Sequence, residues 1–412
     1  NQKGFSIAQL IECKIFPESQ ELKITIDEGR IDGIQLIGNE STQPHVIKRE
    51  MPLKGGEIFD IEKVQRGINN IYGTGLFQRV HPTIVRENDN LILQINLEEK
   101  KYEMVRIGAR YDLERETTGF IELADDNLGG LGMKSLFHAR YGSRQEDYRY
   151  QFRLDRIFIS YLTLDGNLHY TTQTDFLTDQ NNKFKKRGDF KDTRIGGSFS
   201  FGRQLGRFGT VSVKYSFDRL KVEAFPFQSL SISESDFFID KVNENIEIGS
   251  LTLRSVVDTR DKTPFPSQGN FHEIYYETAG TIFGSDISYV KFYSSLGYVY
   301  TFKNTHTIET RVVVGTADET LPYSKRFRWG GMQTFFGKGL NDLHGRMLVA
   351  SNLAYRLKVP LPNLFETYVS IRWDLASIVE KYQNVQFRDF KHAIGTVISM
   401  NLPVGPIEFG YG

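Results

Sequence analysis

The chain has 412 residues, enough for two or three domains, and carries 51 Lys plus Arg against 51 Asp plus Glu. This balance produces no overall field, so the charge does not favour a nucleic-acid partner. The single cysteine, Cys13, excludes an internal disulfide framework and leaves no second thiol for a metal site. No run approaches 18 consecutive apolar residues, so the sequence predicts no transmembrane helix.

Residues 1–29 are expected to be the tail of a preceding domain or a connector. Two short runs, 7–16 and 21–26, have the composition of strands, and two strands alone are only marginally stable in water. The first residues lack the basic and apolar regions of a signal peptide. We therefore expect further sequence before Asn1. The alternative is a simple N-terminal hairpin that packs on the next unit.

Residues 30–100 are predicted to form a compact α+β unit with the element order β-α-α-β-β. A strand over 31–37 comes first, and Ser41 or Thr42 is expected to cap a short helix after it. Asp60 is expected to cap a second helix that continues to about Tyr72. The apolar residues of this helix fall on one stripe, at Ile61, Val64, Ile68 and Ile71. Two further strands, 77–85 and 91–97, complete the unit.

From residue 101 to residue 412, long segments alternate apolar and polar residues. In the first of them, Val105, Ile107, Ala109 and Tyr111 alternate with charged residues and glycine. A period of two indicates a strand with one apolar and one polar face. The segments run to roughly ten to fifteen residues, against about five or six for strands in general. The apolar face is also rich in Tyr and Phe. We therefore predict a transmembrane β-barrel, with a large soluble β-protein as the alternative.

About fifteen strands are expected in the barrel region. Bacterial barrels of this kind normally have an even number, so the closing strand is predicted to be missing from this sequence. The first strand would then present unpaired backbone groups. The expected strands are 104–113, 117–126, 132–142, 147–157, 160–174, 190–203, 209–223, 245–257, 270–281, 286–302, 305–317, 346–358, 365–375, 391–402 and 405–412.

Three phrases ahead of the predicted barrel indicate a family. They are IQLIGN at 34–39, GGEIF at 55–59 and IYGTGLFQRV at 71–80. In this order and spacing they resemble a POTRA domain, the periplasmic module of the BamA/TamA superfamily of outer-membrane proteins. The resemblance implies a sixteen-stranded antiparallel barrel in the bacterial outer membrane, with lipopolysaccharide outside and the POTRA domain in the periplasm.

No catalytic motif is present: the sequence has no G-x-S-x-G, no H-E-x-x-H, no P-loop and no C-x-x-C. We therefore predict no catalytic residue, no metal ligand and no cofactor within this chain. The glycine-rich phrase NLGGLG at 127–132 lies between two predicted strands and opens no helix. It is predicted to be a hairpin turn rather than a phosphate-binding loop.

Residues 327–345 form a glycine-rich segment between two predicted strands. By itself this pattern is also typical of a surface loop. In the superfamily that the chain resembles, this loop folds back into the barrel lumen. There an R-G-F or R-G-Y tripeptide places its arginine against acidic groups of the wall, and a buried arginine needs such a partner. The residues that fit this pattern are Phe327, Gly330, Gly331, Gly337 and Gly345.

The tripeptide itself departs from the family pattern. Phe336 stands at the position of the arginine, and Lys338 stands at the position of the aromatic residue. We expect Lys338 or Arg328 to substitute for the missing arginine, with Asp374 as its partner. The other charges predicted to face the lumen are Glu309, Arg311 and Arg372.

The resemblance implies a protein that inserts other proteins into the outer membrane or translocates them across it. The expected mechanism is strand addition, in which a client strand pairs with the POTRA strand 77–85 or with the barrel seam at 105–113. The implied partners are outer-membrane lipid, unfolded or passenger protein strands, and accessory lipoproteins or a second copy. The alternative is a barrel that anchors or secretes a patatin-like phospholipase whose catalytic domain lies outside this chain. A plain pore and a surface-adhesion barrel are further alternatives.

Overall fold

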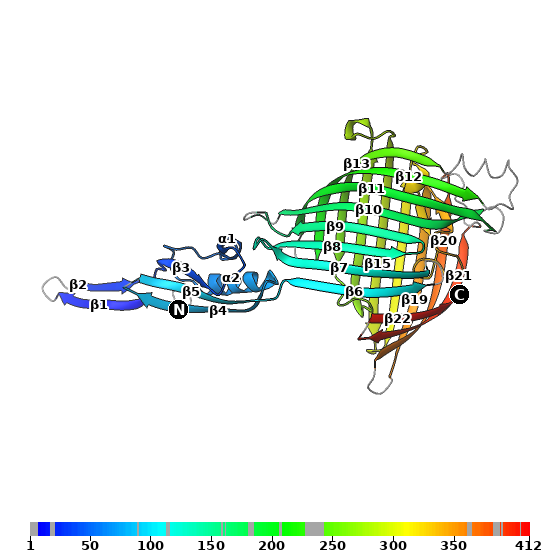
Figure 1. The fold of residues 1–412 in the computed structure, drawn as a ribbon. Coiled ribbons are helices and arrows are strands. Elements are labelled where there is room, and N and C mark those ends of the chain that lie inside the picture. The colour runs from blue at the N-terminus through cyan, green and yellow to red at the C-terminus, as the bar shows by residue number, and fades with distance from the viewer. Residues whose placement is uncertain are drawn as a thin grey trace. The chain divides into compact units, whose positions relative to one another are not determined.

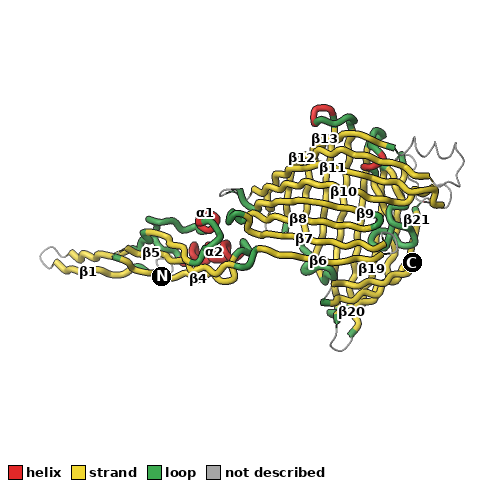
Figure 2. The backbone as a smooth tube through the Cα atoms, viewed as in Figure 1, coloured by secondary structure: helices red, strands yellow, loops and turns green. Residues whose placement is uncertain are grey.

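The computed structural model divides into two compact units, which are described separately. The first consists of residues 1–106, 122–137 and 152–161, and the second of residues 107–121, 138–151 and 162–412. Figures 1 and 2 show the path of the chain. The residues that the structure describes are 7–16, 21–88, 90–112, 116–157, 160, 162–179, 185–205, 208–226, 243–360, 365–381, 388, 390–403 and 405–412.

The first unit begins with two paired strands, which lie in the two runs that the sequence predicts to be strands. β1 (Gln9–Phe16) pairs with β2 (Glu21–Asp27) in a sheet of its own. The register places Leu10 opposite Ile26 and Ile15 opposite Leu22, which collects apolar side chains on one face. These side chains are exposed. The assignment of residues 1–29 to a preceding domain or a connector stays a prediction.

The next elements have the predicted order β-α-α-β-β. They are β3 (Gly33–Ile37), α1 (Pro44–Lys48), α2 (Ile61–Gly73), β4 (Phe77–Glu87) and β5 (Asn90–Glu99). In the sheet, β5 lies between β3, with which it is parallel, and β4, with which it is antiparallel. Asp60 caps α2 as expected, because its carboxylate accepts hydrogen bonds from the backbone of Glu62 and Lys63.

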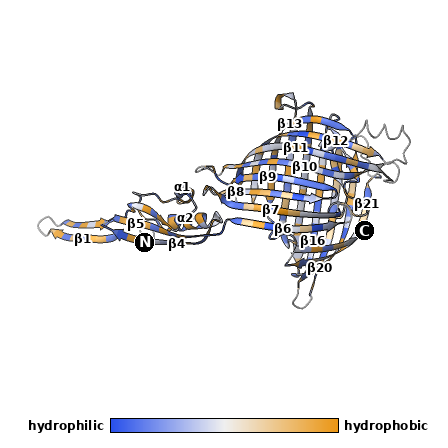
Figure 3. Ribbon diagram, viewed as in Figure 1, coloured by the Kyte–Doolittle hydropathy of each residue, from blue (hydrophilic) through white to orange (hydrophobic). Residues whose placement is uncertain are grey.

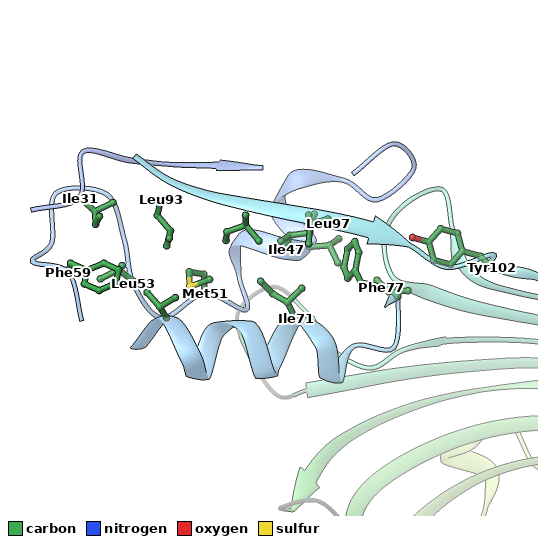
Figure 4. Close-up of a cluster of buried hydrophobic side chains, with 14 residues drawn as sticks. Ile31, Ile47, Met51, Leu53, Phe59, Ile71, Phe77, Leu93, Leu97 and Tyr102 are labelled. Atoms are coloured by element: carbon green, nitrogen blue, oxygen red, sulfur yellow. The ribbon is translucent and has the colours of Figure 1, made fainter. Parts of the chain in front are cut away.

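The core of this small domain lies between one face of the sheet and one face of α2. Every second residue of β5 faces the helices, and residues of α2 three or four positions apart face the sheet. Leu93 and Ile95 of β5 and Val64 and Ile71 of α2 are buried there, and Figure 4 shows several members of this cluster. Full burial of each such side chain contributes about 1.5–3 kcal/mol relative to exposure.

A polar network links this domain to the turn after the second barrel strand within the first unit. The Glu99 carboxylate accepts hydrogen bonds from the backbone N–H of Thr42 at 2.7 Å and of Ser41 at 3.0 Å. The Thr42 hydroxyl lies 3.0 Å from the Tyr102 hydroxyl and accepts a bond from the side chain of Asn127 at 2.9 Å. The expected cap by Ser41 or Thr42 is wrong, because these bonds engage both residues and Gln43 precedes α1 without a side-chain cap.

This network makes the attachment of residues 41–43 sensitive to pH. Partial burial raises the pKa of Glu99, but hydrogen bonds from Thr42 and Ser41 outweigh it and hold the pKa below its ordinary value. Such a carboxyl adds stability above its unfolded pKa of about 4.3, and this contribution is lost as the pH falls through the folded pKa. We therefore expect Glu99→Gln to lower the protection of the amides of residues 41–43 from hydrogen exchange at neutral pH. We also expect the variant to show a smaller loss of this protection as the pH falls. Amide hydrogen exchange of residues 41–43 measures both effects. The exposed Glu40 supplies the control variant Glu40→Gln, and equal acid responses in the two variants would contradict the prediction.

A fifteen-stranded antiparallel sheet forms the rest of the fold, and all fifteen predicted strands are confirmed. Neighbours in the sheet are neighbours in the chain, except that β16 pairs with β19. Figure 1 shows the sheet curving round, and its two edges are β6 and β22. The strands are β6 (Glu103–Asp112), β7 (Glu116–Leu128), β8 (Met133–Gly142), β9 (Gln145–Leu154), β10 (Leu162–Asp179), β11 (Lys185–Leu205), β12 (Gly209–Pro226), β13 (Glu244–Asp258), β14 (Gln268–Ala279), β15 (Tyr289–Phe302), β16 (His306–Ala317), β19 (Met347–Val359), β20 (Glu366–Val379), β21 (Lys391–Leu402) and β22 (Gly405–Tyr411).

The two faces of this sheet differ in the way that the alternation predicts. On β20, Ile371 and Trp373 are exposed on the outer face, whereas Asp374 is buried on the inner face. Figure 3 shows hydrophobic and hydrophilic residues alternating along the strands. Among the described residues, no helix is long and apolar enough to cross a membrane.

Strands β10 and β11 extend beyond their predicted ends. The polar residues of 175–190 suggest a loop, yet Asp175 pairs with Phe190 and Phe176 pairs with Asp189 in the sheet. The alternation that marks a half-buried strand fades where both faces are polar, so the pattern underestimates the length of these strands. The predicted turn at 127–132 is confirmed, and the Asn127 side chain accepts a bond from the backbone of Gly132 at 2.7 Å.

Candidate functional site: the inner loop and the sheet wall

The connection between β16 and β19, residues 318–346, is called the inner loop here. It contains a 3₁₀ turn, η2 (Tyr323–Lys325), and a small hairpin of β17 (Phe327–Trp329) and β18 (Leu343–Gly345). Its apolar side chains pack on the inner face of the wall strands rather than standing out as a surface loop. The buried cluster consists of Phe327, Trp329, Phe335 and Leu343 from the loop and Val313, Leu348, Ala350 and Ala376 from the wall.

Glycines allow the tight folding of the loop. Gly330 has φ of 137°, and a Cβ atom there would lie 2.3 Å from the carbonyl oxygen of Gly339. The Thr334 hydroxyl donates to the Gly330 carbonyl at 2.6 Å and accepts from its N–H at 2.9 Å. Gly331 and Gly337 also have positive φ. These residues set the backbone path that brings Phe336 to the wall.

Asp374 lies at the centre of the contact between the loop tip and the wall. Its side chain is fully buried on β20, and the register places Asn352 of β19 directly opposite. One carboxylate oxygen accepts from the Asn352 amide at 2.7 Å. The other accepts from the backbone N–H of Phe336 at 3.0 Å. Asn352 also donates to the Thr334 carbonyl at 2.9 Å, so the wall grips the loop backbone at two points.

The arginine at this contact comes from the wall. Arg372 donates to Asp374 from Nη2 at 2.8 Å and from Nε at 3.1 Å, and its guanidinium lies 4.1 Å from the centre of the Phe336 ring. A planar guanidinium over an aromatic face is an attractive arrangement. Residues two apart on a strand share a face, which is why Arg372 and Asp374 meet.

The expected substitution of the loop arginine by Arg328 with Asp374 as partner is therefore wrong. Arg328 instead lies 3.6 Å from Asp175 of β10, with its guanidinium 4.7 Å from the Phe190 ring. The backbone carbonyl of Lys338 accepts a hydrogen bond from Gly331 at 2.9 Å. A role for the Lys338 side chain as a substitute stays a prediction.

A second set of contacts fixes the beginning of the loop to a different part of the wall. The Glu244 carboxylate of β13 accepts bonds from the backbone of Tyr323 and Ser324. Arg194 of β11 donates to the Ser324 carbonyl at 2.8 Å. Lys291 of β15 donates to the Lys325 carbonyl at 2.7 Å. Strands β11 to β15 thus hold the start of the loop, whereas β19 and β20 hold its tip.

The remaining predicted wall charges also face inward. Arg311 donates to the Ser295 hydroxyl at 2.9 Å, and its guanidinium lies 5.6 Å from the Trp329 ring of the loop. Glu309 forms an ion pair with Arg356 on the neighbouring strand β19. Arg311 therefore contacts the loop, while Glu309 braces two wall strands against each other.

The structure also places Phe327, Gly345 and the predicted seam residues. The Lys291 ammonium lies 4.5 Å from the centre of the Phe327 ring. A Cβ atom at Gly345 would come within 2.7 Å of Ile378. The seam residues all lie exposed on the edge strand β6: Val105, Ile107, Ala109 and Tyr111.

Several residues at this site were missed by sequence reasoning. Asn352 bridges the loop to Asp374, Asp175 receives both Arg328 and the side chain of Asn341, and Glu408 of β22 accepts a bond from Gln333 at 3.1 Å. Each of them is polar on an inward position, which is a weak signal, but its partner depends on the strand register. In the described part of the chain, no group of three or more His, Cys, Asp or Glu residues is arranged to hold a metal. The site joins a loop to a wall through hydrogen bonds, ion pairs and packing.

Comparison with known proteins agrees with this architecture. The Omp85 superfamily domain matches residues 127–412, and the POTRA family, described as surface antigen variable number repeat, matches residues 17–100. The outer membrane protein assembly factor BamA of Nitratidesulfovibrio vulgaris is 22% identical over 401 residues. That match covers 93% of this chain but 48% of the relative, so the chain spans about half of that protein's length.

Two solved structures share the fold at low sequence identity. The structure of BamA from Haemophilus ducreyi lacking POTRA domains 1–3 has a TM-score of 0.77 and 15% identity, and the match covers 99% of this chain and 86% of that one. CdiB from Acinetobacter baumannii has a TM-score of 0.56 and 13% identity, with 97% of this chain and 72% of that chain covered. Because the superfamily domain matches more than half of the chain, the protein belongs to the Omp85 superfamily and is an outer-membrane protein with a periplasmic POTRA domain.

Proposed function

We propose that this protein inserts client proteins into the outer membrane, or translocates them across it, by strand addition. The observation that supports the proposal is the first strand of the barrel sheet. In the part of the chain that the structure describes, β6 pairs only with β7. The other side of β6 therefore presents a row of backbone N–H and C=O groups to a further strand.

Unpaired edges of this kind are costly within a membrane. An unsatisfied backbone group in the hydrocarbon core costs several kcal/mol, because no water is present to replace the missing partner. A strand that arrives at such an edge gains these hydrogen bonds and keeps its own backbone paired as it enters the lipid. The exposed apolar residues on the outer face of β6, among them Ile107 and Tyr111, suit a neighbour that also faces lipid.

The POTRA domain supplies a second edge in the periplasm. β4 lies at the edge of the three-stranded sheet, and it pairs only with β5 among the described strands. An extended client segment can add to β4 through main-chain hydrogen bonds, which bind with little demand on the client's sequence. We propose that β4 receives client segments before they reach the barrel edge.

Cysteine crosslinking to a client tests the barrel edge. The exposed Cys13 is first replaced by serine, since it is the only cysteine in the chain. Ile107→Cys on β6 is then presented with a urea-unfolded outer-membrane barrel that carries one cysteine in its C-terminal strand. We expect a disulfide between the two strands, because directly opposed residues of paired strands lie about 4.5–5.5 Å apart at Cβ. Moving the client cysteine by two residues is expected to move the reactive position on β6 by two residues.

The matched control is Ile274→Cys on β14. Ile274 is also exposed, but β14 is paired on both sides, with β13 and β15. Crosslinking at Ile107→Cys no stronger than at Ile274→Cys would overturn strand addition at this edge. Reaction at every position of β6, without dependence on the client position, would indicate nonspecific contact and would also overturn it.

The implied partners of this activity are client strands, the lipid around the barrel, and accessory lipoproteins or a second copy, and we propose no catalysis within residues 1–412. The alternative is a barrel that anchors or secretes a patatin-like phospholipase, and such a barrel would not need the arginine of an assembly-type loop. In this chain Arg372 supplies the cation at that contact from the wall, so the absence of a loop arginine does not argue against an assembly-type loop. The patatin-like alternative stays a prediction about sequence outside this chain.

A further inference from the structure

Glycines stand at the positions of the last two strands that face Phe336 and Met332 of the loop tip. Gly395 lies on β21, Gly410 lies on β22, and Gly412 follows directly after β22. A Cβ atom at Gly395 would lie 2.7 Å from Phe336 Cγ, and one at Gly412 would lie 2.9 Å from Phe336 Cβ. A Cβ at Gly410 would lie 2.9 Å from Met332 Sδ and 3.2 Å from Phe336 Cε1. The three residues are called the glycine cradle here.

The cradle lies beside the arginine that covers the same ring. The register pairs Arg372 of β20 with Gly395 of β21, and Thr396 with Tyr411 of β22. Arg372 contacts the Phe336 ring at 4.1 Å from its centre. The Phe336 ring therefore lies across three neighbouring strands. It contacts the Arg372 guanidinium on β20, and on β21 and β22 it packs against glycine backbone.

Glycine in these positions needs a reason, because it weakens a strand and provides no side chain to pack. An aromatic ring laid over a strand glycine restores the missing packing and shields the backbone beneath it. The ring of Phe336 is itself buried, and its backbone N–H is fixed to Asp374 at 3.0 Å. The loop thus holds the ring in place from one side, and the glycine cradle accepts it on the other.

A polar contact strengthens the attachment of the same edge. Gln333 of the loop donates to Glu408 of β22 at 3.1 Å. β22 also pairs with β21 over Gly405–Tyr411. The loop tip therefore contacts β22 through both a hydrogen bond and the Phe336 ring.

We propose that Phe336 latches the C-terminal strand pair β21–β22 to the inner loop, with the glycine cradle as the receptor for its ring. Phe336 is then a positioning residue for these two strands of the sheet. Withdrawal of the ring frees β21 and β22 to separate from the loop, which couples movement of the loop to the mobility of this strand pair.

Amide hydrogen exchange of β22 tests the latch on the full chain in lipid nanodiscs, without any client. Phe336→Ala is expected to speed exchange of the amides of 405–411 by roughly tenfold, the factor that corresponds to about 1.4 kcal/mol. Phe336→Leu, which keeps an apolar side chain but loses the ring, is expected to give a smaller increase and serves if the alanine variant does not fold. Exchange of β14 is expected to stay unchanged in both variants. Unaltered exchange of β22 in both variants would overturn the proposal.

A second set of variants tests the cradle. Gly395→Ala is expected to speed exchange of β22 because its methyl group displaces the ring, and adding Phe336→Ala is expected to cause no further increase. The control is Gly297→Ala, an inner-face glycine of β15 whose added Cβ would meet no atom closer than 3.5 Å. Full additivity of Gly395→Ala and Phe336→Ala would show that the glycine acts without the ring, which overturns the cradle. These results do not depend on a client, so loss of crosslinking at Ile107→Cys with a normal latch would count against the proposed function alone.

Discussion

Replacement of Asp374 by alanine is expected to release the inner loop from the sheet wall. The Asp374 carboxylate is fully buried and accepts bonds from Arg372, from Asn352 and from the backbone of Phe336. Its removal leaves a guanidinium, an amide and a backbone N–H without their acceptor. Loss of one partner from a buried ion pair typically costs about 3–5 kcal/mol, so undocking of the loop becomes far more favourable.

The two tryptophans of the chain provide the measurement. Trp329 is buried in the loop, whereas Trp373 is exposed on the outer face of β20. In a Trp373→Phe background, the fluorescence reports on the loop alone. Asp374→Ala is expected to shift the emission of Trp329 to longer wavelength and to increase its quenching by acrylamide.

Glu273 supplies a matched control for this experiment. It is an acid on the wall strand β14 that forms an ion pair with Arg254 at 2.7 Å, and the Arg254 side chain is 50% exposed and the Glu273 side chain 19% exposed. Water reaches this pair, which weakens it relative to a fully buried pair, so Glu273→Ala is expected to leave the Trp329 emission unchanged. Equal spectra for Asp374→Ala and Glu273→Ala would contradict the central role of Asp374.

Replacement of Glu50 by alanine is expected to destabilise the first unit strongly. Glu50 is buried between Arg156, with which it forms an ion pair, and Arg49, whose Nε lies 3.4 Å away. Both arginine side chains are largely buried. The alanine variant removes the buried carboxylate that lies between these two cations, and removal of one partner from a buried ion pair costs about 3–5 kcal/mol.

Amide exchange of residues 44–51 in the full chain measures this effect. We expect Glu50→Ala to speed exchange there by at least about a hundredfold, which corresponds to roughly 2.8 kcal/mol. The control is Glu57→Ala, which removes an exposed ion pair with Lys63 in the same domain. If the exchange rates of residues 44–51 in the two variants differ by less than a factor of a few, Glu50 does not stabilise this segment.

Most of the fold was predictable from the sequence because it depends on short-range periodicity. The alternation in 104–113 marks β6, and the stripe of Ile61, Val64, Ile68 and Ile71 marks α2 together with its Asp60 cap. Errors arose where a side chain had a distant partner. Thr42 looks like a helix cap in sequence, but its hydroxyl is engaged by Tyr102 and Asn127, which lie far along the chain.

The candidate site was predictable only in part, for a related reason. The glycines of 327–345 indicate a folded loop, and the position of Asp374 on a polar strand face indicates that it points inward. The partner of Asp374 depends on whether a loop residue or a neighbour on the same strand reaches it first. Arg372 lies two residues away on the same face and needs no loop to reach the carboxylate, so this nearer cation pairs with Asp374 where Arg328 was expected.

Arginine fits on only one side of the contact between Phe336 and Arg372. A mutation to arginine at position 336 alone brings two cations to the single carboxylate of Asp374, and loss of Arg372 alone leaves that carboxylate without its cation. Each single change therefore leaves charges unbalanced at a buried contact, which is costly. We therefore expect positions 336 and 372 to change together among relatives, with an arginine at one of them but not at both.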